Sequence, residues 1–202
     1  NLEKIFNILK ALWPVAVMID EADAFLGNRD SGGDSGTSSR IFGSIASFMG
    51  NTEYRGKIIW FLLTCRPDLL PVDLKRQGRA EVHIPLFAPH DEAERRGLHR
   101  ALAKKAKIED AVVDVAMPAD RALTGAEVEA IFVRAGRRAF LRGAARVEAE
   151  DERAEAEAFL PPQHGEEIEL QALAAVIECS DRRFLPERWR DADRARVAQH
   201  PC

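Results

Sequence analysis

Two acidic residues directly follow an apolar run and stand where carboxylates could act on a bound phosphate group. They are Asp20 and Glu21, in the stretch VAVMIDEADAF of residues 15–25. An unbroken apolar run is typical of a strand covered on both faces of a parallel sheet, and ligands of such sheets bind beside the carboxyl ends of the strands. A first carboxylate there can hold Mg²⁺ through water beside nucleotide phosphates, and a second can orient or deprotonate an attacking water. Taken alone, the pattern fits a strand that ends in solvated acids equally well.

A second stretch with candidate chemistry is LLTCRPDLLPVDLKRQGR, residues 62–79. Its Thr64 comes 44 residues after Asp20 and directly follows the run KIIWFLL, which predicts a second buried strand. Near the end of the stretch, Arg76 and Arg79 flank a glycine. Guanidinium forks offer several hydrogen-bond donors to phosphoryl oxygens as charge shifts in a transition state. Without its context, KRQGR is typical of a solvated basic turn.

Helices and strands alternate in the part of the chain that carries both stretches. In chain order, the sequence predicts a helix over 1–14, a strand over 15–19, a polar glycine-rich loop over 26–39, a helix that starts at Thr37 or Ser38 and ends at Gly50, a strand over 57–63, a short helix over 71–75 and a third strand over 81–86. This alternation predicts an α/β sheet.

After Pro89 the pattern predicts helices alone. The helical stretches are 91–106, 109–117, 124–142, 147–159 and 168–178. Thr124 and Glu127 have the T-x-x-E spacing of a capping box at the start of the third of these. We therefore expect a domain boundary near Pro89, with an α/β part over 1–89 and a helical part over 90–202.

The composition and the charge exclude several classes of protein. Among 202 residues, 46% are apolar and 31% are charged, which predicts a packed core. No apolar run approaches the roughly 20 residues that span a bilayer, and no secretory signal opens the chain. A net charge of -4 gives no argument for a nucleic-acid partner. The cysteines and histidines lack metal-ligand spacing, so we expect reduced cysteines, no metal site of that kind and a cytoplasmic location.

The two stretches and the helices after them resemble AAA ATPases of the AAA+ superfamily in their order and spacing. In that family a strand ends in Thr-Asn-Arg-Pro, and a short helix and two arginines around a glycine follow. Here the strand ends in TCRPD and the arginines stand in KRQGR. The resemblance runs over essentially the whole chain. It implies a partial αβα sandwich of the P-loop NTPase type over 1–89, which starts just before the Walker B motif and lacks the Walker A strand. It also implies an α-helical lid with a tail over 90–202.

The resemblance implies roles for the acidic and the basic residues. Asp20 would serve Mg²⁺ through water, and Glu21 would activate the water that attacks ATP. Arg76 and Arg79 would be arginine fingers, which in this family reach the γ-phosphate bound by a neighbouring subunit. ATP and Mg²⁺ are therefore the implied ligands.

Further positions acquire nucleotide-contact roles through the resemblance. Thr64 and Cys65 stand at the sensor position that follows the second strand. Gly125 and Ala126 match the Gly-Ala element of a lid helix that lies beside the nucleotide in the family, although they fit a plain helix start equally well. The loop of residues 27–39 matches the second pore loop of family hexamers, and its glycine content fits a simple connector equally well.

The sequence departs from the family pattern in three places. The phosphate-binding loop G-x-x-x-x-G-K-[ST] is absent from these residues, so the sheet should show a gap or unpaired edges. Cys65 stands where the family has a sensor Asn, and a thiol is a weak donor, while Thr64 beside it should point to the opposite face. The Phe-Asp that usually follows the second finger is Ala80-Glu81, which weakens the placement of Arg79.

The function implied by the resemblance is ATP binding and hydrolysis by a ring of identical subunits, as a hexamer, that remodels or unfolds a protein partner. The 202 residues alone are expected to be inactive, because nothing in them cradles the β- and γ-phosphates. The alternative is a degenerate AAA module that serves as a nucleotide-responsive assembly scaffold without efficient hydrolysis, which Cys65 favours. A DEAD-box helicase is rejected, because TCRPD replaces its Ser-Ala-Thr type motif and only helices follow Pro89.

Overall fold

The computed structural model describes residues 2–26, 35–108, 123–161 and 165–194. Contacts between residues divide the chain into two compact units. The first, here called the α/β unit, comprises Asn1–Pro85 and Gly165–Cys202, and the second, the helical unit, comprises Leu86–His164. None of the helices in the described ranges is long and apolar enough to cross a membrane.

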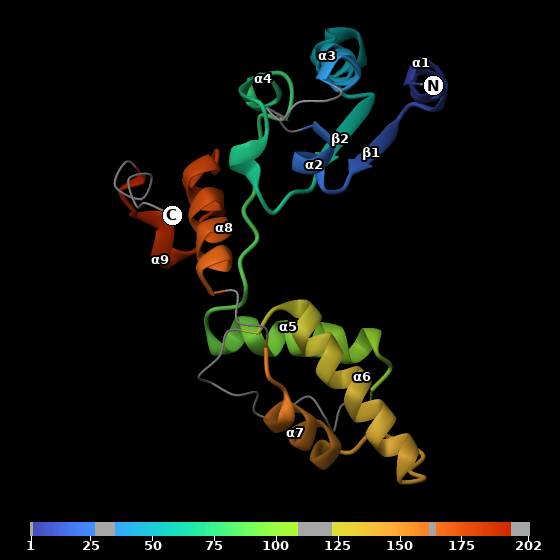
Figure 1. Cartoon of the computed structure of the whole chain (residues 1–202), viewed down its shortest axis with the longest axis vertical. Coiled ribbons are helices and arrows are strands. Elements are labelled where there is room, and N and C mark those ends of the chain that lie inside the picture. Colours follow the sequence, from blue (N-terminus) through green and yellow to red (C-terminus); the bar gives the residue numbers. More distant parts are fainter. Residues whose placement is uncertain (1, 27–34, 109–122, 162–164, 195–202) are drawn as a thin grey trace. The chain divides into compact units, whose positions relative to one another are not determined.

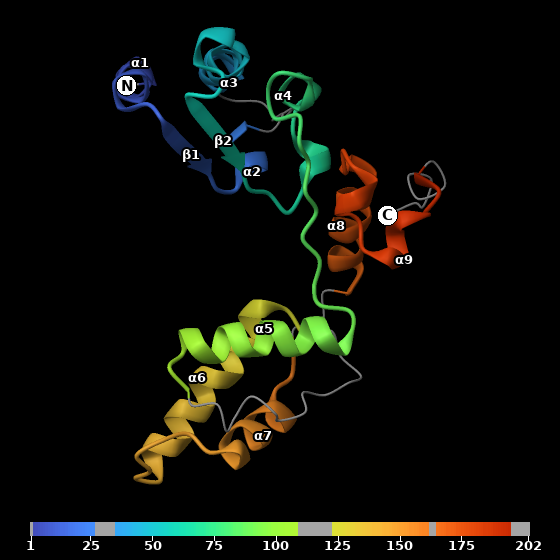
Figure 2. The same cartoon turned by 180° about the vertical axis from the view of Figure 1, so that it is seen from behind.

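The α/β unit contains a parallel sheet formed by the two strands that the apolar runs predict. β1 (Val15–Ile19) pairs with β2 (Ile58–Leu62), with Val15 opposite Ile58. The strands lie side by side in both views (Figures 1 and 2). The predicted fold class, a partial α/β fragment followed by helices, is confirmed. Within the described residues the sheet consists of these two strands, so both outer edges are unpaired, as the sequence predicts.

Helices cover one face of this sheet. α1 (Leu2–Leu12) and α3 (Ser35–Gly50) pack against that face. The buried side chains shared by these helices and the sheet include Leu9, Ile45, Phe48, Met49 and Ile58. On the other face Met18, Ile59 and Phe61 are 67%, 56% and 47% exposed. The apolar runs predict cover on both faces, and the described residues supply it on one.

The pattern EVHIPL predicts a third strand over 81–86, but the structure forms none there. The segment instead bonds to Ser180, two residues after the end of α8 (Gly165–Glu178). The His83 amide donates to Ser180 Oγ at 2.8 Å, and the Ser180 amide donates to the His83 carbonyl at 3.4 Å. A strand needs a neighbouring strand for its hydrogen bonds, and the described part of the chain offers none here. The prediction is wrong because a local pattern does not supply that neighbour.

Of the connecting helices, one matches the sequence prediction, one is not predicted and one starts earlier than predicted. α2 (Ala22–Leu26) succeeds the acidic stretch, and α4 (Val72–Lys75) is the short helix predicted in that place. α3 begins at Ser35, so the predicted caps Thr37 and Ser38 lie within the helix. The run SGTSS offers several small polar residues that can each start a helix, so the pattern alone does not select one.

The last helices group with the sheet and not with the helical unit. α8 and α9 (Glu187–Arg190) belong to the α/β unit, whereas the sequence assigns all of 90–202 to the helical lid. Lys75 Nζ donates to Glu178 Oε1 at 2.7 Å and thus joins α4 to α8 across 103 positions. Helical periodicity carries no information on such a distant contact.

Short 3₁₀ helices lie at Thr52–Tyr54, Pro67–Leu69 and Arg182–Phe184.

The helical unit packs α5 (Glu92–Lys105), α6 (Gly125–Leu141) and α7 (Ala149–Ala158) around one core (Figure 2). Its buried residues are Ala103, Leu123, Val128, Ile131, Phe132, Ala156 and Phe159. The predicted capping box is confirmed at the start of α6. The Thr124 amide donates to Glu127 Oε2 at 2.7 Å, and the Glu127 amide donates to Thr124 Oγ1 at 3.3 Å. The helix predicted over 109–117 lies outside the described residues.

Two neighbouring carboxylates, Asp151 and Glu152, are buried in α7. Arg142 donates to both oxygens of Asp151, at 3.0 Å and 2.8 Å, and these hydrogen bonds hold the pKa of Asp151 below its usual value. Glu152 contacts the ring of His99, but burial raises the pKa of Glu152 above its usual value. The shifts differ in sign because Asp151 has a bidentate guanidinium partner and Glu152 has not.

Replacing Arg142 with Met should destabilise the helical unit near neutral pH, because the buried Asp151 carboxylate would lose its bidentate guanidinium partner. It would keep the Glu148 amide at 3.0 Å and Arg138 at 3.6 Å. Since the folded-state pKa of Asp151 is lowered, the stabilising effect of its ionised carboxylate is complete above the unfolded-state pKa of about 3.8. It is lost as the pH falls through the folded-state value. Urea unfolding at pH 7 and pH 3 should show a smaller difference between wild type and variant at pH 3. An equal difference at both pH values would contradict this account. As a control, Arg100→Met on exposed surface should change stability by less than about 0.5 kcal/mol.

Candidate functional site

The acidic stretch leaves β1 at the carboxyl edge of the sheet. Asp20 and Glu21 are both exposed there. The Leu63 amide donates to the Ile19 carbonyl, and the Ala22 amide donates to the Leu63 carbonyl, each at 2.9 Å. These bonds extend the pairing of the strands past their ends. The two carboxylates therefore stand in solvent beside the end of β2, at the edge where parallel sheets bind ligands.

Glu21 has an unusual backbone conformation, with φ of 50°. For a residue other than glycine, this left-handed region costs about 1–2 kcal/mol. Local hydrogen bonds hold it there: the Glu21 amide donates to Asp20 Oδ1 at 2.9 Å, and its carbonyl accepts from the Ala24 and Phe25 amides at 3.0 Å and 3.1 Å. Glu21 thus forms the turn from β1 into α2. Backbone strain of this kind gathers at functional positions in proteins.

Thr64 turns towards the acidic stretch. Its hydroxyl donates to Asp23 Oδ1 at 2.5 Å and accepts from the Arg66 amide at 2.9 Å. Cys65 is exposed, with a free thiol. Strand alternation predicts that Thr64 and Cys65 point to opposite faces, and this stays a prediction. Because β2 ends at Leu62, the alternation does not extend to these two positions.

Asp23 is a member of this site to which the sequence assigns no role. The available signal is its place three residues after Asp20 in an acidic stretch. By accepting from Thr64, it ties α2 to the segment after β2. This hydrogen bond steadies the turn that carries Asp20 and Glu21.

The carboxylate oxygens at this edge fit an Mg²⁺ ion that is held partly through water molecules. Within the described ranges, no group of three or more His, Cys, Asp or Glu side chains could hold a metal ion. Mg²⁺ beside nucleotide phosphates does not need such a group, because it keeps several waters and binds one or two carboxylates. Asp20 accepts from the Glu21 amide with Oδ1, which leaves Oδ2 to the water ligands of an ion.

Arg76 and Arg79 differ in how firmly the fold holds them. The Arg76 side chain is 69% exposed and pairs with the Asp73 carboxylate at 3.1 Å. An ion pair so exposed contributes little, so Arg76 can reorient towards a ligand. Arg79 is half-buried, and its Nη1 donates to the Asp73 carbonyl at 2.7 Å.

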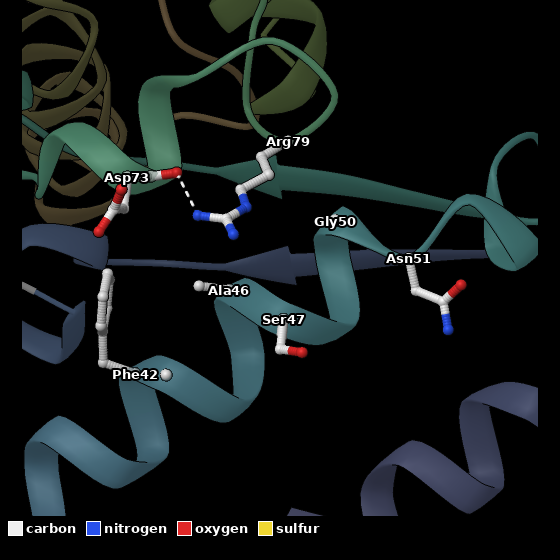
Figure 3. A pocket seen from close by; sticks show the side chains of 8 residues that line it. Phe42, Ala46, Ser47, Gly50, Asn51, Asp73 and Arg79 are labelled. Carbon is white, nitrogen blue, oxygen red and sulfur yellow. Dashed lines mark hydrogen bonds between the residues drawn. The ribbon is translucent and has the colours of Figure 1, made fainter.

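Arg79 lies across the end of α3, in a groove of about 480 Å³ (Figure 3). The groove is lined by Phe42, Gly43, Ala46, Ser47, Gly50, Asn51, Asp73 and Arg79. A Cβ at Gly50 would lie 3.2 Å from Arg79 Nε, whereas a Cβ at Gly43 would have nothing within 4 Å. Glycine at position 50 therefore lets the guanidinium lie close to the helix.

The predicted lid and pore elements are only partly described. Gly125 and Ala126 begin α6 in the helical unit, and a Cβ at Gly125 would meet Leu98 at an ordinary 3.7 Å. The fold of that unit therefore does not itself require glycine there, and the role of the pair beside a nucleotide stays a prediction. Of the predicted pore loop, 27–34 lie outside the described residues and 35–39 begin α3.

The chain is similar to known ATPases. Residues 1–87 match the family model described as ATPase family associated with various cellular activities (AAA). The chain is 26% identical to a cell division cycle protein 48 homolog of Archaeoglobus fulgidus over 195 residues, which cover 95% of this chain and 26% of that protein. It is 30% identical to an ATPase family protein 2 homolog of Caenorhabditis elegans over 132 residues, 64% of this chain and 18% of that protein. A vesicle-fusing ATPase of Dictyostelium discoideum is 29% identical over 131 residues, 62% of this chain and 18% of that protein.

The chain spans between 18% and 26% of the length of these three relatives. The family match over 1–87 contains both the acidic strand end and the stretch with the two arginines. The similarity to the archaeal relative continues through the helices that follow.

Proposed function

Residues 1–87 are part of an AAA ATPase module, and we propose that the protein that contains them binds and hydrolyses ATP with Asp20 and Glu21 in its active site. The observation that carries the proposal is the exposed pair of carboxylates at the end of β1, with Glu21 held at φ of 50°. A strained, solvent-facing acid at the ligand-binding edge of a parallel sheet has a chemical use and no evident packing use.

Glu21 is the proposed general base. Its carboxylate would orient the water that attacks the γ-phosphate and accept a proton from it. Asp20 would hold the water ligands of Mg²⁺, which when bound neutralises charge on the phosphates. Thr64 and Cys65 belong to the proposed nucleotide-sensing position, and the bond from Thr64 to Asp23 links that position to the acidic turn.

Arg76 is the proposed arginine finger, which would act on ATP bound by a neighbouring subunit. Its exposure and its weak pairing with Asp73 support the proposal, because the guanidinium must reach a group outside its own unit. Arg79 is the second candidate. Its position in the groove along α3 supports a role in holding the surface next to Arg76.

The proposal includes assembly, because an arginine that acts on a neighbour requires several copies of the chain. We propose a ring, as a hexamer, that remodels or unfolds a protein partner in the cytoplasm, with Gly125 and Ala126 beside the nucleotide. The support is the resemblance to AAA ATPases and the relatives named above.

The second candidate is a nucleotide-responsive scaffold without efficient hydrolysis. Cys65 favours it, because a thiol stands where the family pattern has an Asn carboxamide, and a thiol donates only weakly. A phosphate-binding loop upstream of these residues in the full-length protein would favour the enzyme, and a degenerate loop would favour the scaffold.

Phosphate release by the full-length protein tests the proposal, with Glu21→Gln as the deciding variant. Mg²⁺-dependent turnover that is lost in the variant supports the enzyme. ATP binding without turnover in the wild-type protein supports the scaffold instead.

Gly50→Ala should reduce ATP turnover a fewfold, because the added methyl group would displace the Arg79 guanidinium from the groove. Gly43→Ala adds the same methyl group to the same helix with nothing within 4 Å, so it should retain wild-type turnover. Steady-state phosphate release by both full-length variants measures the difference. Equal turnover in the two variants would show that the position of the Arg79 guanidinium in the groove does not affect turnover.

A further inference from the structure

Backbone hydrogen bonds join the two ends of the loop that carries both arginines. We call residues 76–79 the arginine loop. The Arg79 amide donates to the Arg76 carbonyl at 3.1 Å, and just after the loop the Ala80 amide donates to the Leu74 carbonyl at 2.9 Å. The loop is therefore a compact turn, and its direction depends on what holds its two ends.

The first end is held by Lys75, the residue before the loop. Lys75 Nζ donates to Glu178 Oε1 at 2.7 Å and to the Pro67 carbonyl at 3.1 Å. The side chains of Lys75 and Glu178 are only 13% and 23% exposed. An ion pair shielded to this degree is less weakened by solvent than one on open surface.

The second end is held by His83, shortly after the loop. Its ring nitrogens contact two carbonyl oxygens, that of Glu178 from Nδ1 at 2.6 Å and that of Ala80 from Nε2 at 2.8 Å. Its amide donates to Ser180 Oγ at 2.8 Å. The backbone on this side of the loop is thus bonded to the end of α8.

Both contacts come from one short segment, Glu178–Ser180. Within it Cys179 is 4% exposed, and one turn earlier Val176 is fully buried, so the segment is itself anchored in the α/β unit. Its partners lie about a hundred positions earlier in the chain, with separations of 103 for Lys75 and 95 for His83. A single anchored segment therefore fixes both flanks of the arginine loop.

We propose that the Glu178–Ser180 segment positions the arginine loop and thereby sets how well Arg76 acts on the nucleotide of a neighbouring subunit. The inference rests on the proposed role of Arg76. Glu178 is a positioning residue, since its carboxylate contacts Lys75. Displacing a catalytic group by about 1 Å can cost about 100-fold in rate, so a hold on both ends of the loop matters for turnover.

In the full-length protein, Glu178→Ala should lower kcat for ATP hydrolysis about tenfold and change the KM for ATP little, because the loop acts in the transition state. Lys75→Met should have a similar effect. The double variant should be no slower than either single variant, because both substitutions remove the same contact. Glu169→Ala, at an exposed acid on the same helix, is the matched control and should retain wild-type turnover.

Mixed assemblies separate positioning from loss of structure. A Glu178→Ala subunit keeps its Glu21, and a Glu21→Gln subunit keeps its arginine loop in place. Mixing the two variants should therefore give faster turnover than either alone. Wild-type turnover in Glu178→Ala, additive losses in the double variant, or no gain on mixing would overturn the inference. Absence of hydrolysis by the wild-type protein would instead overturn the proposed function.

Discussion

Glu21→Gln should lower kcat for ATP hydrolysis at least about 100-fold and leave ATP affinity nearly unchanged. The carboxamide keeps the size of the side chain, but it does not accept a proton from water at neutral pH. Because Glu21 is exposed, the substitution removes no packing. Steady-state phosphate release and equilibrium ATP binding by the full-length protein measure the two quantities. Unchanged turnover would remove Glu21 from the mechanism.

Two further variants separate the chemistry of Glu21 from its structural role. Glu53→Gln, at another exposed acid of the same unit, should retain full activity. Glu21→Gly removes the carboxylate and also relieves the cost of a side chain at φ of 50°. It should be inactive, yet no less stable than wild type and up to about 1 kcal/mol more stable. A large loss of stability in Glu21→Gly would instead assign the residue a structural role.

Arg76→Ala should lower turnover about 1000-fold, the lower end of the effect of removing an arginine finger. A guanidinium offers several donors to the phosphoryl oxygens as charge shifts in the transition state, and alanine offers none. Arg79→Ala should have a smaller effect, because the Arg79 guanidinium is held by the Asp73 carbonyl and the end of α3. Single-turnover and steady-state hydrolysis by the full-length variants measure both losses.

A neighbouring subunit with an intact Arg76 should restore the turnover that the Arg76→Ala variant loses. Mixed with Glu21→Gln subunits, Arg76→Ala subunits have their Glu21 sites completed by an intact arginine, so turnover should exceed that of either variant alone. Arg40→Ala, at an exposed arginine on α3, should need no such repair. Failure of the mixture to recover activity would place Arg76 on the nucleotide of its own subunit or outside the site.

The parts of the fold that depend on neighbouring residues in the chain were open to prediction from sequence. The runs VAVMI and IIWFL form β1 and β2, and the T-x-x-E spacing forms the capping box of Thr124 and Glu127. In each of these cases, the residues that form the pattern and the residues that interact lie within a few positions of each other. Sequence reasoning also brought Asp20 and Glu21 to the sheet edge, because the direction of a parallel strand decides where its last residues emerge.

The third strand was wrongly predicted because a strand depends on a distant partner. EVHIPL has the composition of a strand, but a strand requires a neighbour, and the described residues of this region bond instead to Ser180. The Thr64 hydroxyl, just after the end of β2, donates to Asp23 across 41 positions. Neither partner is visible in the local pattern.

By itself, then, the sequence determined the chemical groups, the order of the elements and the likeness to AAA ATPases, since all of these follow from residue type and short-range spacing. Tertiary structure alone decided the strained turn at Glu21, the different holds on Arg76 and Arg79, and the grouping of α8 with the sheet. Each of these depends on which segments meet in space, and a contact such as that of Lys75 with Glu178 spans half of the chain. The local propensities of the residues do not indicate which distant segments will come into contact.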